Sequence, residues 1–217
     1  MTKDPTSAAR FASVLGHSRA IAVLKRSLAA DRVHHAYLFS GADGVGKRSA
    51  AWALAAAVNC PERSADGDAC GRCVSCHKVS ERTHPDVLQV EPDGRQIKID
   101  QIRDLHARSR FRPHEGVRRV IIIDRADTMR EEASNALLKN LEEPRGETMF
   151  VLVTSSPQRL LTTIRSRCQP VRFGRLTLAA IEAIVRAARP DAAADALAVA
   201  VRLADGSAGA ALDALDG

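Results

Sequence analysis

The spacing of apolar and polar positions changes along the chain and divides it into two parts. Up to about Arg175, short runs of apolar and β-branched residues alternate with segments in which apolar residues recur every three or four positions. The first pattern is typical of strands and the second of amphipathic helices. Strands that alternate with helices indicate an α/β fold with an open parallel sheet. After Arg175 the chain is rich in alanine, and only the helical spacing remains.

These runs place the individual elements. We expect strands at residues 35–40, 86–90, 117–124, 149–154 and 170–173, and helices at 18–30, 46–59, around 99–107, at 133–143 before Pro144, and at 157–166. Residues 60–76 are predicted to be irregular. The strand at 117–124 contains a continuous β-branched run, which suits a strand covered on both faces.

The two textures predict two domains. Residues 1–175 form the α/β domain, with an insertion at residues 60–76. Residues 176–217 form a small domain of three helices, at 177–189, 192–204 and 208–215. We expect the boundary close to Gly174, where the strand pattern stops.

Composition narrows the class of protein. The chain has 217 residues, of which 45% are hydrophobic and 27% charged, as in globular soluble proteins. No apolar run approaches the roughly 20 residues of a membrane span, and residues 1–10 are too polar for a secretory signal. We therefore expect a cytoplasmic protein. The formal net charge of +6 permits a nucleotide or nucleic-acid partner, but only 3% aromatic residues argue against a base-stacking platform.

A phosphate-binding loop is the most specific motif. Gly41, Gly44, Gly46 and Lys47 follow a predicted strand and open a predicted helix in the pattern GxxxxGK. Such glycines let backbone N–H groups surround phosphate oxygens, and the helix N-terminus adds a positive field. Lys47 would reach the outer phosphates. The alternative is a glycine-rich turn with a chance lysine.

Arg48 occupies the position at which a P-loop carries a serine or threonine. That hydroxyl normally binds Mg²⁺, whereas a guanidinium has no lone pair to offer. Ser49 could substitute, but a shift of one residue rotates a helical side chain by about 100°. The sequence therefore predicts that the magnesium ligand is lost, while Arg48 could add a contact to phosphate.

Polar residues end two further strands. Asp124 follows an apolar strand, as in a Walker B motif, and would hold magnesium directly or through water. Its alternative role is a helix N-cap. The next position usually carries the acid that activates water, but Arg125 cannot accept a proton. Asp127 could substitute. Thr154 ends another strand and is predicted to face the same crevice.

Four cysteines follow the helix after the P-loop. Cys60, Cys70, Cys73 and Cys76 form the pattern C-x₉-C-x₂-C-x₂-C. Four thiolates suit tetrahedral Zn²⁺ and leave no open position, so we expect a structural zinc. His77 is a possible substitute ligand. Reactive thiols or disulfides are the alternative.

Arg167 lies between a predicted helix and the last strand, in the sequence Ser166-Arg167-Cys168. An arginine at a domain edge can act as an arginine finger, which stabilises a phosphoryl group held by another subunit. The alternative is an ordinary surface arginine. Cys168 alone is typical of a small core residue.

Together these motifs resemble the bacterial sliding-clamp loader subunits of the AAA+ family. The resemblance runs from about Phe11 to Leu215. It rests on VLGH at 14–17, HAYLF at 35–39, the P-loop, the four cysteines, THPD at 83–86, NALLKNLEEP at 135–144 and SRC at 166–168. It implies an AAA+ P-loop domain with a zinc module, followed by a helical lid.

The family contains two subunit types between which the residues discriminate. The motor subunits, gamma and tau, have a complete Walker A motif, an acidic pair in Walker B and a sensor-2 arginine. The delta-prime type keeps the fold, the zinc module and the arginine finger but has a damaged ATP site. Arg48, Arg125 and Gly209, which stands where the sensor-2 arginine would be, favour the delta-prime type.

The resemblance also implies partners and a role. The family forms a pentamer of motor, delta and delta-prime subunits that opens a ring clamp and loads it on primed DNA during replication. Arg167 would complete the ATP site of a neighbouring motor subunit, whereas ATP or ADP would bind this chain weakly or not at all. The family's third, collar domain is expected to be absent from residues 1–217. An autonomous ATPase and a zinc-dependent nucleic-acid binding module remain alternatives.

Overall fold

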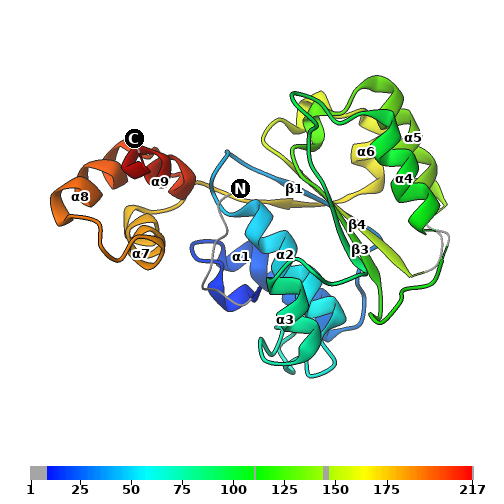
Figure 1. Ribbon diagram of the computed structural model, residues 1–217, viewed down its shortest axis with the longest axis horizontal. Coiled ribbons are helices and arrows are strands. Elements are labelled where there is room, and N and C mark those ends of the chain that lie inside the picture. Colours follow the sequence, from blue (N-terminus) through cyan, green and yellow to red (C-terminus); the bar gives the residue numbers. More distant parts are fainter. Residues whose placement is uncertain (1–8, 110, 144–146, 217) are drawn as a thin grey trace.

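The computed structural model describes residues 9–109, 111–143 and 147–216. Five parallel strands form one sheet in the order β2-β3-β4-β1-β5 (Figure 1). The strands are β1 (Ala36–Ser40), β2 (Val87–Val90), β3 (Arg119–Ile123), β4 (Thr148–Thr154) and β5 (Gln169–Arg172). The parallel α/β architecture predicted from the alternating pattern is confirmed.

Helices cover both faces of the sheet (Figure 1). On one side lie α1 (Ser18–Ala29), α2 (Lys47–Asn59) and α3 (Val74–Ser80); on the other lie α4 (Ile99–Ser109), α5 (Glu131–Glu142) and α6 (Thr162–Arg167). Short 3₁₀ helices lie at η1 (Phe11–Ser13), η2 (Ala126–Thr128) and η3 (Pro157–Arg159).

Each face of the sheet belongs to a separate hydrophobic core. Along β3, Val120 and Ile122 pack into the core beneath α1 and α2, whereas Ile121 and Ile123 pack into the core beneath α4 and α5. Successive side chains of a strand point to opposite faces. A strand between two cores must therefore be apolar throughout, which explains the continuous β-branched run of this segment.

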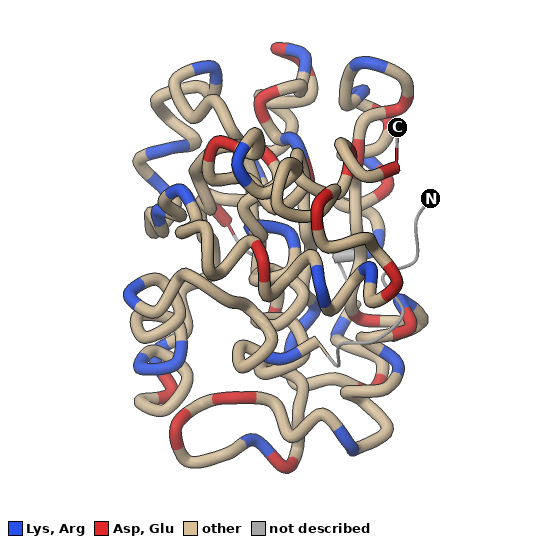
Figure 2. Tube along the Cα trace, turned by 90° about the vertical axis from the view of Figure 1, so that its left-hand side faces the viewer, with Lys and Arg blue, Asp and Glu red and all other residues tan. Residues whose placement is uncertain are grey.

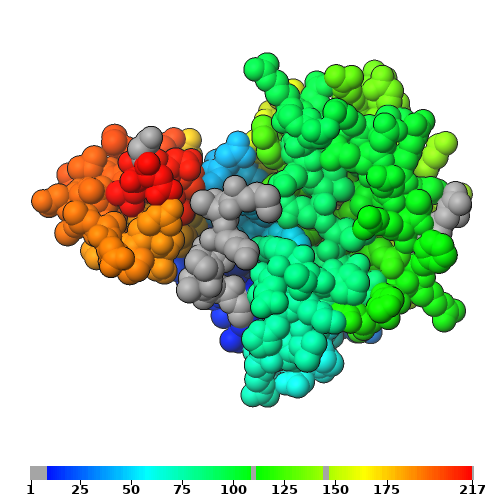
Figure 3. All heavy atoms as spheres, in the orientation of Figure 1, coloured from blue at the N-terminus to red at the C-terminus, as the bar shows by residue number. Residues whose placement is uncertain are grey.

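The C-terminal helices form a small unit at one end of the sheet domain, coloured orange to red in Figures 1 and 3. They are α7 (Leu178–Ala188), α8 (Ala194–Leu203) and α9 (Ala208–Asp216). One buried residue from each helix, Ile181, Leu197 and Ala211, belongs to the same hydrophobic core. We refer to α7–α9 as the lid. Among the residues that the structure describes, no helix has the length and apolar character needed to cross a bilayer.

Two predicted elements differ from the observed ones. Helix α3 begins at Val74, inside the stretch predicted to be irregular, because the Cys73 sulfur caps it by accepting the N–H of Cys76. The single helix predicted at 157–166 is divided into η3 and α6. The backbone is extended at Leu160, whose side chain is buried in the core beneath α4 and α5. Pro144 lies outside the described residues.

Candidate functional site

The P-loop connects the end of β1 to the start of α2. Gly44 and Gly46 have φ angles of 70° and 102°, in the left-handed region that glycine adopts without strain. Lys47 is 5% exposed, and its ammonium donates to the carbonyl oxygens of Gly41 and Ala42 at 2.8 and 2.6 Å. Burial lowers the pKa of Lys47. The loop thus wraps around its own lysine.

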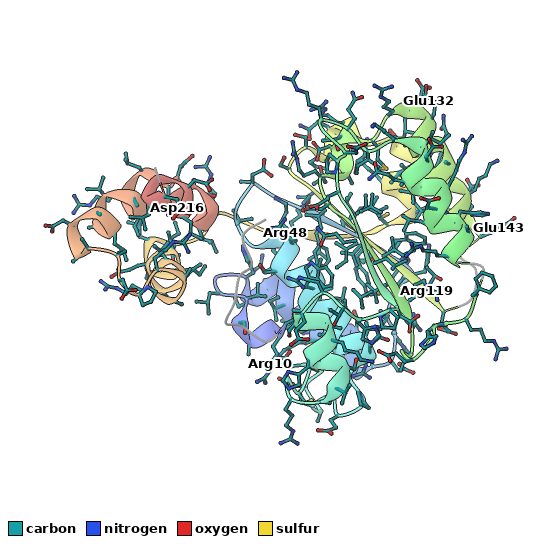
Figure 4. The ribbon with its side chains drawn as sticks, viewed as in Figure 1. Arg10, Arg48, Arg119, Glu132, Glu143 and Asp216 are labelled. Carbon is teal, nitrogen blue, oxygen red and sulfur yellow. The ribbon has the colours of Figure 1, made fainter. Side chains whose placement is uncertain are left out.

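Arg48 pairs with the carboxylate that was predicted to hold magnesium. Its Nη1 lies 3.4 Å from Oδ2 of Asp124, and the backbone N–H of Arg125 donates to Oδ1 of Asp124 at 3.0 Å. Figure 4 shows Arg48 at the start of α2, on the side of the sheet domain that faces the lid. Both oxygens of Asp124 therefore have positively polarised partners from the chain itself. This donor set does not fit Mg²⁺, which requires oxygen ligands.

Thr154 reaches the same crevice from the end of β4. Its hydroxyl donates to Oδ1 of Asp127 at 2.5 Å and accepts the N–H of Ser156 at 2.9 Å. Thr154 is only 1% exposed. Asp127, the substitute acid considered from the sequence, thus has one carboxylate oxygen bonded to Thr154.

A cavity of about 280 Å³ brings most of the predicted nucleotide-binding residues together. It is lined by Asp43, Gly44, Gly46, Lys47, Arg48, Ser49, Asp124, Arg125, Val153, Thr154 and Ser155. Gly41 lies just outside the lining, where the oxygen of Phe173 would be 2.2 Å from an added Cβ. The parallel topology explains the assembly, because the carboxyl ends of β1, β3 and β4 meet at one edge.

The lid touches the P-loop through two glycines. The N–H of Gly209 donates to the carbonyl oxygen of Gly44 at 3.0 Å. A Cβ on Gly209 would lie 2.8 Å from Cα of Gly44, and a Cβ on Gly44 would lie 2.3 Å from Oγ of Ser207. Sequence reasoning identified Gly209 only as a missing arginine. Its contact with the loop depends on how α9 packs against the P-loop, and no local sequence pattern predicts that contact.

The four cysteines come together between α2 and α3. Their sulfurs all lie within 4.8 Å of one another, and the Cys60–Cys73 and Cys70–Cys76 pairs are each separated by 3.9 Å. Four sulfurs around one Zn²⁺ at about 2.3 Å lie about 3.8 Å apart. The cluster therefore fits a tetrahedral metal ion. His77 is exposed and does not belong to this cluster.

Backbone donors also prepare the cluster for thiolates. The N–H groups of Cys70, Cys73 and Cys76 point to the sulfurs of Cys60, Cys70 and Cys73 at 3.3–3.4 Å. Burial raises the pKa of Cys60 and Cys76. At Cys70 burial also opposes ionisation, but the N–H groups of Arg72 and Cys73 lower the pKa to about 7. A bound cation would offset the burial of the remaining thiolates.

Arg167 ends α6 and is held by α5. Its Nη2 lies 2.7 Å from Oε1 of Glu142, and its Nη1 donates to the carbonyl oxygen of Thr163 at 2.9 Å. The Arg167 side chain is 35% exposed. It lines no part of the P-loop cavity, so any role in phosphoryl chemistry requires a second chain. Glu142, its partner, lies in the segment 135–144 that supported the family resemblance, but the sequence assigned it no role of its own.

Basic and acidic residues are interspersed along the trace (Figure 2). The net charge is +6, but the basic residues that produce it lie among many carboxylates. A protein that tracks a phosphate backbone by itself concentrates Lys and Arg on one face. The arrangement argues against an autonomous nucleic-acid binding module.

The sheet order, the P-loop and the helical lid define a P-loop protein of the AAA+ class. The RuvB Holliday junction branch migration motor of Thermotoga maritima shares this fold, with a TM-score of 0.64 at 16% identity over 97% of this chain and 63% of that chain. The family model described as "DNA polymerase III, delta subunit" matches residues 16–177. The chain belongs to this DNA polymerase III delta subunit family.

Two curated relatives from Bacillus subtilis frame the comparison. DNA polymerase III subunit delta' is 44% identical over 164 residues, which are 76% of this chain and 49% of that protein. DNA polymerase III subunit tau is 36% identical over 211 residues, which are 95% of this chain and 37% of that protein. The chain thus spans half or less of the length of these relatives.

Proposed function

We propose that this chain is a delta-prime-type subunit of the DNA polymerase III clamp loader. It takes part in loading the sliding clamp on primed DNA, in the cytoplasm, together with motor and delta subunits. Residues 1–175 are its P-loop domain, and residues 176–217 its lid. It hydrolyses little ATP itself and supplies Arg167 to the ATP site of a neighbouring motor subunit.

The observation that carries this proposal is the pairing of Asp124. Hydrolysis in a P-loop site needs a metal ion between the phosphates and a group that positions water. Here Arg48 pairs with the carboxylate at the metal position, and Arg125 stands at the position of the water-activating acid. Each substitution removes one requirement of the reaction, and neither removes the fold.

The surroundings of Arg167 support its role in trans. The side chain is one-third exposed at the end of α6, and Glu142 and Thr163 hold its guanidinium from two sides. A guanidinium already restrained in this way loses little conformational freedom when it meets a phosphate. The cysteine cluster supports a structural Zn²⁺ remote from any chemistry, because four sulfurs leave no position for substrate.

Removing Arg167 tests the proposal. In a complex reconstituted with motor subunits, delta subunit, clamp and primed DNA, Arg167→Ala should slow hydrolysis at the adjoining motor site by about 10³-fold or more. Clamp loading should fall with it. The matched control is Arg165→Ala, which removes a guanidinium from the same helix that bonds only locally to Thr162 among the contacts described. The measurements are the rate of ATP hydrolysis in single-turnover assays and the amount of clamp loaded on primed DNA.

Two results would contradict the proposal. Arg167→Ala and Arg165→Ala could leave the complex equally active, which would remove the finger assignment. Alternatively, the purified chain could hydrolyse ATP at a rate typical of motor subunits, and Lys47→Ala could abolish that activity. The second result favours a motor-type subunit or an autonomous ATPase, for which the similarity to subunit tau over 95% of this chain is the supporting observation.

A further inference from the structure

We propose that the P-loop cavity binds the diphosphate group of a nucleotide in its metal-free form, with the Arg48 guanidinium in the place of Mg²⁺. This inference rests on the proposed function, since it concerns the nucleotide site of a subunit that does not hydrolyse ATP. The sequence predicted that ATP or ADP binds this chain weakly or not at all. The proposal is instead that the cavity binds a diphosphate group without Mg²⁺. The metal preference, and not merely the catalytic rate, has changed.

Both oxygens of the Asp124 carboxylate already have partners in the chain. A divalent cation at Asp124 must displace Arg48 from one oxygen and compete with the Arg125 N–H at the other. The Asp124 side chain is 13% exposed, whereas that of Arg48 is 60% exposed, so the carboxylate is the protected half of the pair. Mg²⁺ also gives up water reluctantly and requires oxygen ligands at 2.0–2.1 Å in near-octahedral geometry. The position that usually offers a hydroxyl offers a guanidinium instead.

The lining of the cavity carries a net positive charge. The charged residues lining the cavity are the cations Lys47, Arg48 and Arg125 and the carboxylates Asp43 and Asp124. Together they leave an excess of one positive charge before any ligand arrives. A metal-free diphosphate is complementary to this lining. A magnesium complex of the same ligand carries less negative charge and adds a cation to a cationic cavity, so its binding is weaker.

The Arg48 guanidinium is placed to contact both Asp124 and a bound phosphate. A guanidinium has five N–H donors in a planar fork and matches phosphate oxygens in a bidentate manner. The Arg48 side chain is 60% exposed and lines the cavity. One edge can therefore stay on Asp124 while another meets a phosphate, as a metal ion would bridge the two. The loop supplies the remaining contacts through the N-terminus of α2 and its left-handed glycines, Gly44 and Gly46.

The test is the metal dependence of binding to the isolated 217-residue chain. Titration calorimetry with ADP should give a dissociation constant about tenfold lower in buffer freed of divalent cations on a chelating resin before the protein is added than in excess Mg²⁺, a difference of about 1.4 kcal/mol. EDTA is not used, because it would also remove a Zn²⁺ held by the four cysteines. Inorganic pyrophosphate is titrated in parallel. Binding of ADP alone identifies a nucleotide ligand, and binding of both ligands identifies the diphosphate group itself. Either result in the Mg²⁺-free buffer supports the proposal.

Two variants make the test specific. Arg48→Ser should reverse the preference, because it frees Asp124 and restores a hydroxyl, so that ADP binds more tightly with Mg²⁺ than in the Mg²⁺-free buffer. Arg103→Ser is the control, since Arg103 is another exposed arginine paired with a carboxylate, Asp100, on α4. It should behave as the unmodified chain. Circular dichroism verifies that both variants are folded.

The outcomes are separable from those of the proposed function. Tighter binding with Mg²⁺ in the unmodified chain, or no binding of either ligand in either buffer, overturns the inference. An unchanged preference in Arg48→Ser overturns it as well. None of these results bears on Arg167 in the reconstituted complex. Conversely, a failure of the Arg167 experiment leaves the metal preference of this cavity as measured.

Discussion

At the scale of single residues, the carboxylate of Asp86 organises the segment that leads into β3. Asp86 is fully buried and accepts the N–H groups of His114, Glu115 and Gly116 at 2.7–2.9 Å. Arg119 Nη2 lies 3.2 Å from the same carboxylate. The sequence motif at residues 83–86 supported the family resemblance without a physical reason. The structure supplies one: this aspartate ties a long loop to the sheet.

Arg119 completes the same network from the first position of β3. Its guanidinium also donates to the carbonyl oxygens of Arg108, Phe111 and Arg112. Figure 4 shows it on the far side of the sheet domain from the lid. A buried pair with so many hydrogen bonds is costly to break from one side, because the remaining charge is left without a partner.

Asp86→Asn should therefore lower the free energy of unfolding by about 3–5 kcal/mol at neutral pH. The variant leaves Arg119 uncompensated and turns an amide N–H₂ toward the donors of one of the two oxygens, either His114 and Arg119 or Glu115 and Gly116. Urea unfolding followed by circular dichroism measures the change. Asp100→Asn, at an exposed ion pair on α4, should change it by less than about 1 kcal/mol. Equal changes in the free energy of unfolding in the two variants would show that the buried network stabilises the chain no more than an exposed ion pair does.

The pH dependence of stability, compared between the unmodified chain and Asp86→Asn, is a second test of this network. Burial disfavours the Asp86 anion, but its hydrogen bonds outweigh burial and hold its pKa below the ordinary value. A lowered folded-state pKa contributes stability above the unfolded pKa, and that stability is lost as pH falls through the folded value. The unmodified chain should lose stability on acidification, and Asp86→Asn should lose less over the same range.

At the scale of elements, the contact between α9 and the P-loop depends on the absence of side chains. The loop and the start of α9 approach backbone to backbone at Gly44 and Gly209. The N–H of Gly209, at the start of α9, has no intrahelical acceptor and finds one in the loop. A larger residue at position 209 must push the lid away from the loop or displace the loop itself.

Gly209→Ala should destabilise the chain by about 1–2 kcal/mol. Overpacking costs about 1–3 kcal/mol, and the helix propensity of alanine returns less than about 1 kcal/mol. Gly174→Ala is the control, since a Cβ there meets nothing within 4 Å. The midpoint of thermal unfolding is measured for both variants. An equal loss of stability in the two variants would contradict a lid held by this contact.

At the scale of the whole molecule, the cysteine module joins the N-terminal segment to the sheet domain. Cys60 and Cys76 belong to the same core as α1 and α2. Asp68, within the module, accepts the N–H groups of Phe11 and Ala12 at 2.9 and 3.0 Å. A metal that holds the module together therefore stabilises much more than the loop that binds it.

We expect one Zn²⁺ per chain in purified protein, and Cys76→Ser should lose it. The lost metal should lower the stability by at least about 2 kcal/mol, which shifts the melting temperature by roughly 4–8 °C in a chain of this size. Cys168→Ser is the control: burial raises the pKa of Cys168 to about 12, and it lies in the other core. Metal content by mass spectrometry decides the matter, and retention of Zn²⁺ in Cys76→Ser would exclude this ligand set.

The sequence by itself determined the kind of fold and the composition of the site. Periodicity located all five strands, because strand and helix leave different spacings of apolar residues. The residues of the P-loop and of the cysteine cluster could also be named from the sequence. Each of these motifs lies within a short stretch of chain, so its spacing is visible without the fold. The helix limits near Cys73 and Leu160 were missed because a sulfur cap and a buried side chain decided them.

Only the tertiary structure decided how the functional groups pair. Arg48 and Asp124 are 76 positions apart, and Gly44 and Gly209 are farther apart still, yet each pair is in contact. A parallel sheet brings the ends of distant strands to one edge, and no local pattern records which side chains then meet there. The sequence predicted that a magnesium ligand was missing. The fold showed that the Arg48 guanidinium pairs with the Asp124 carboxylate, at the position predicted for the metal ion.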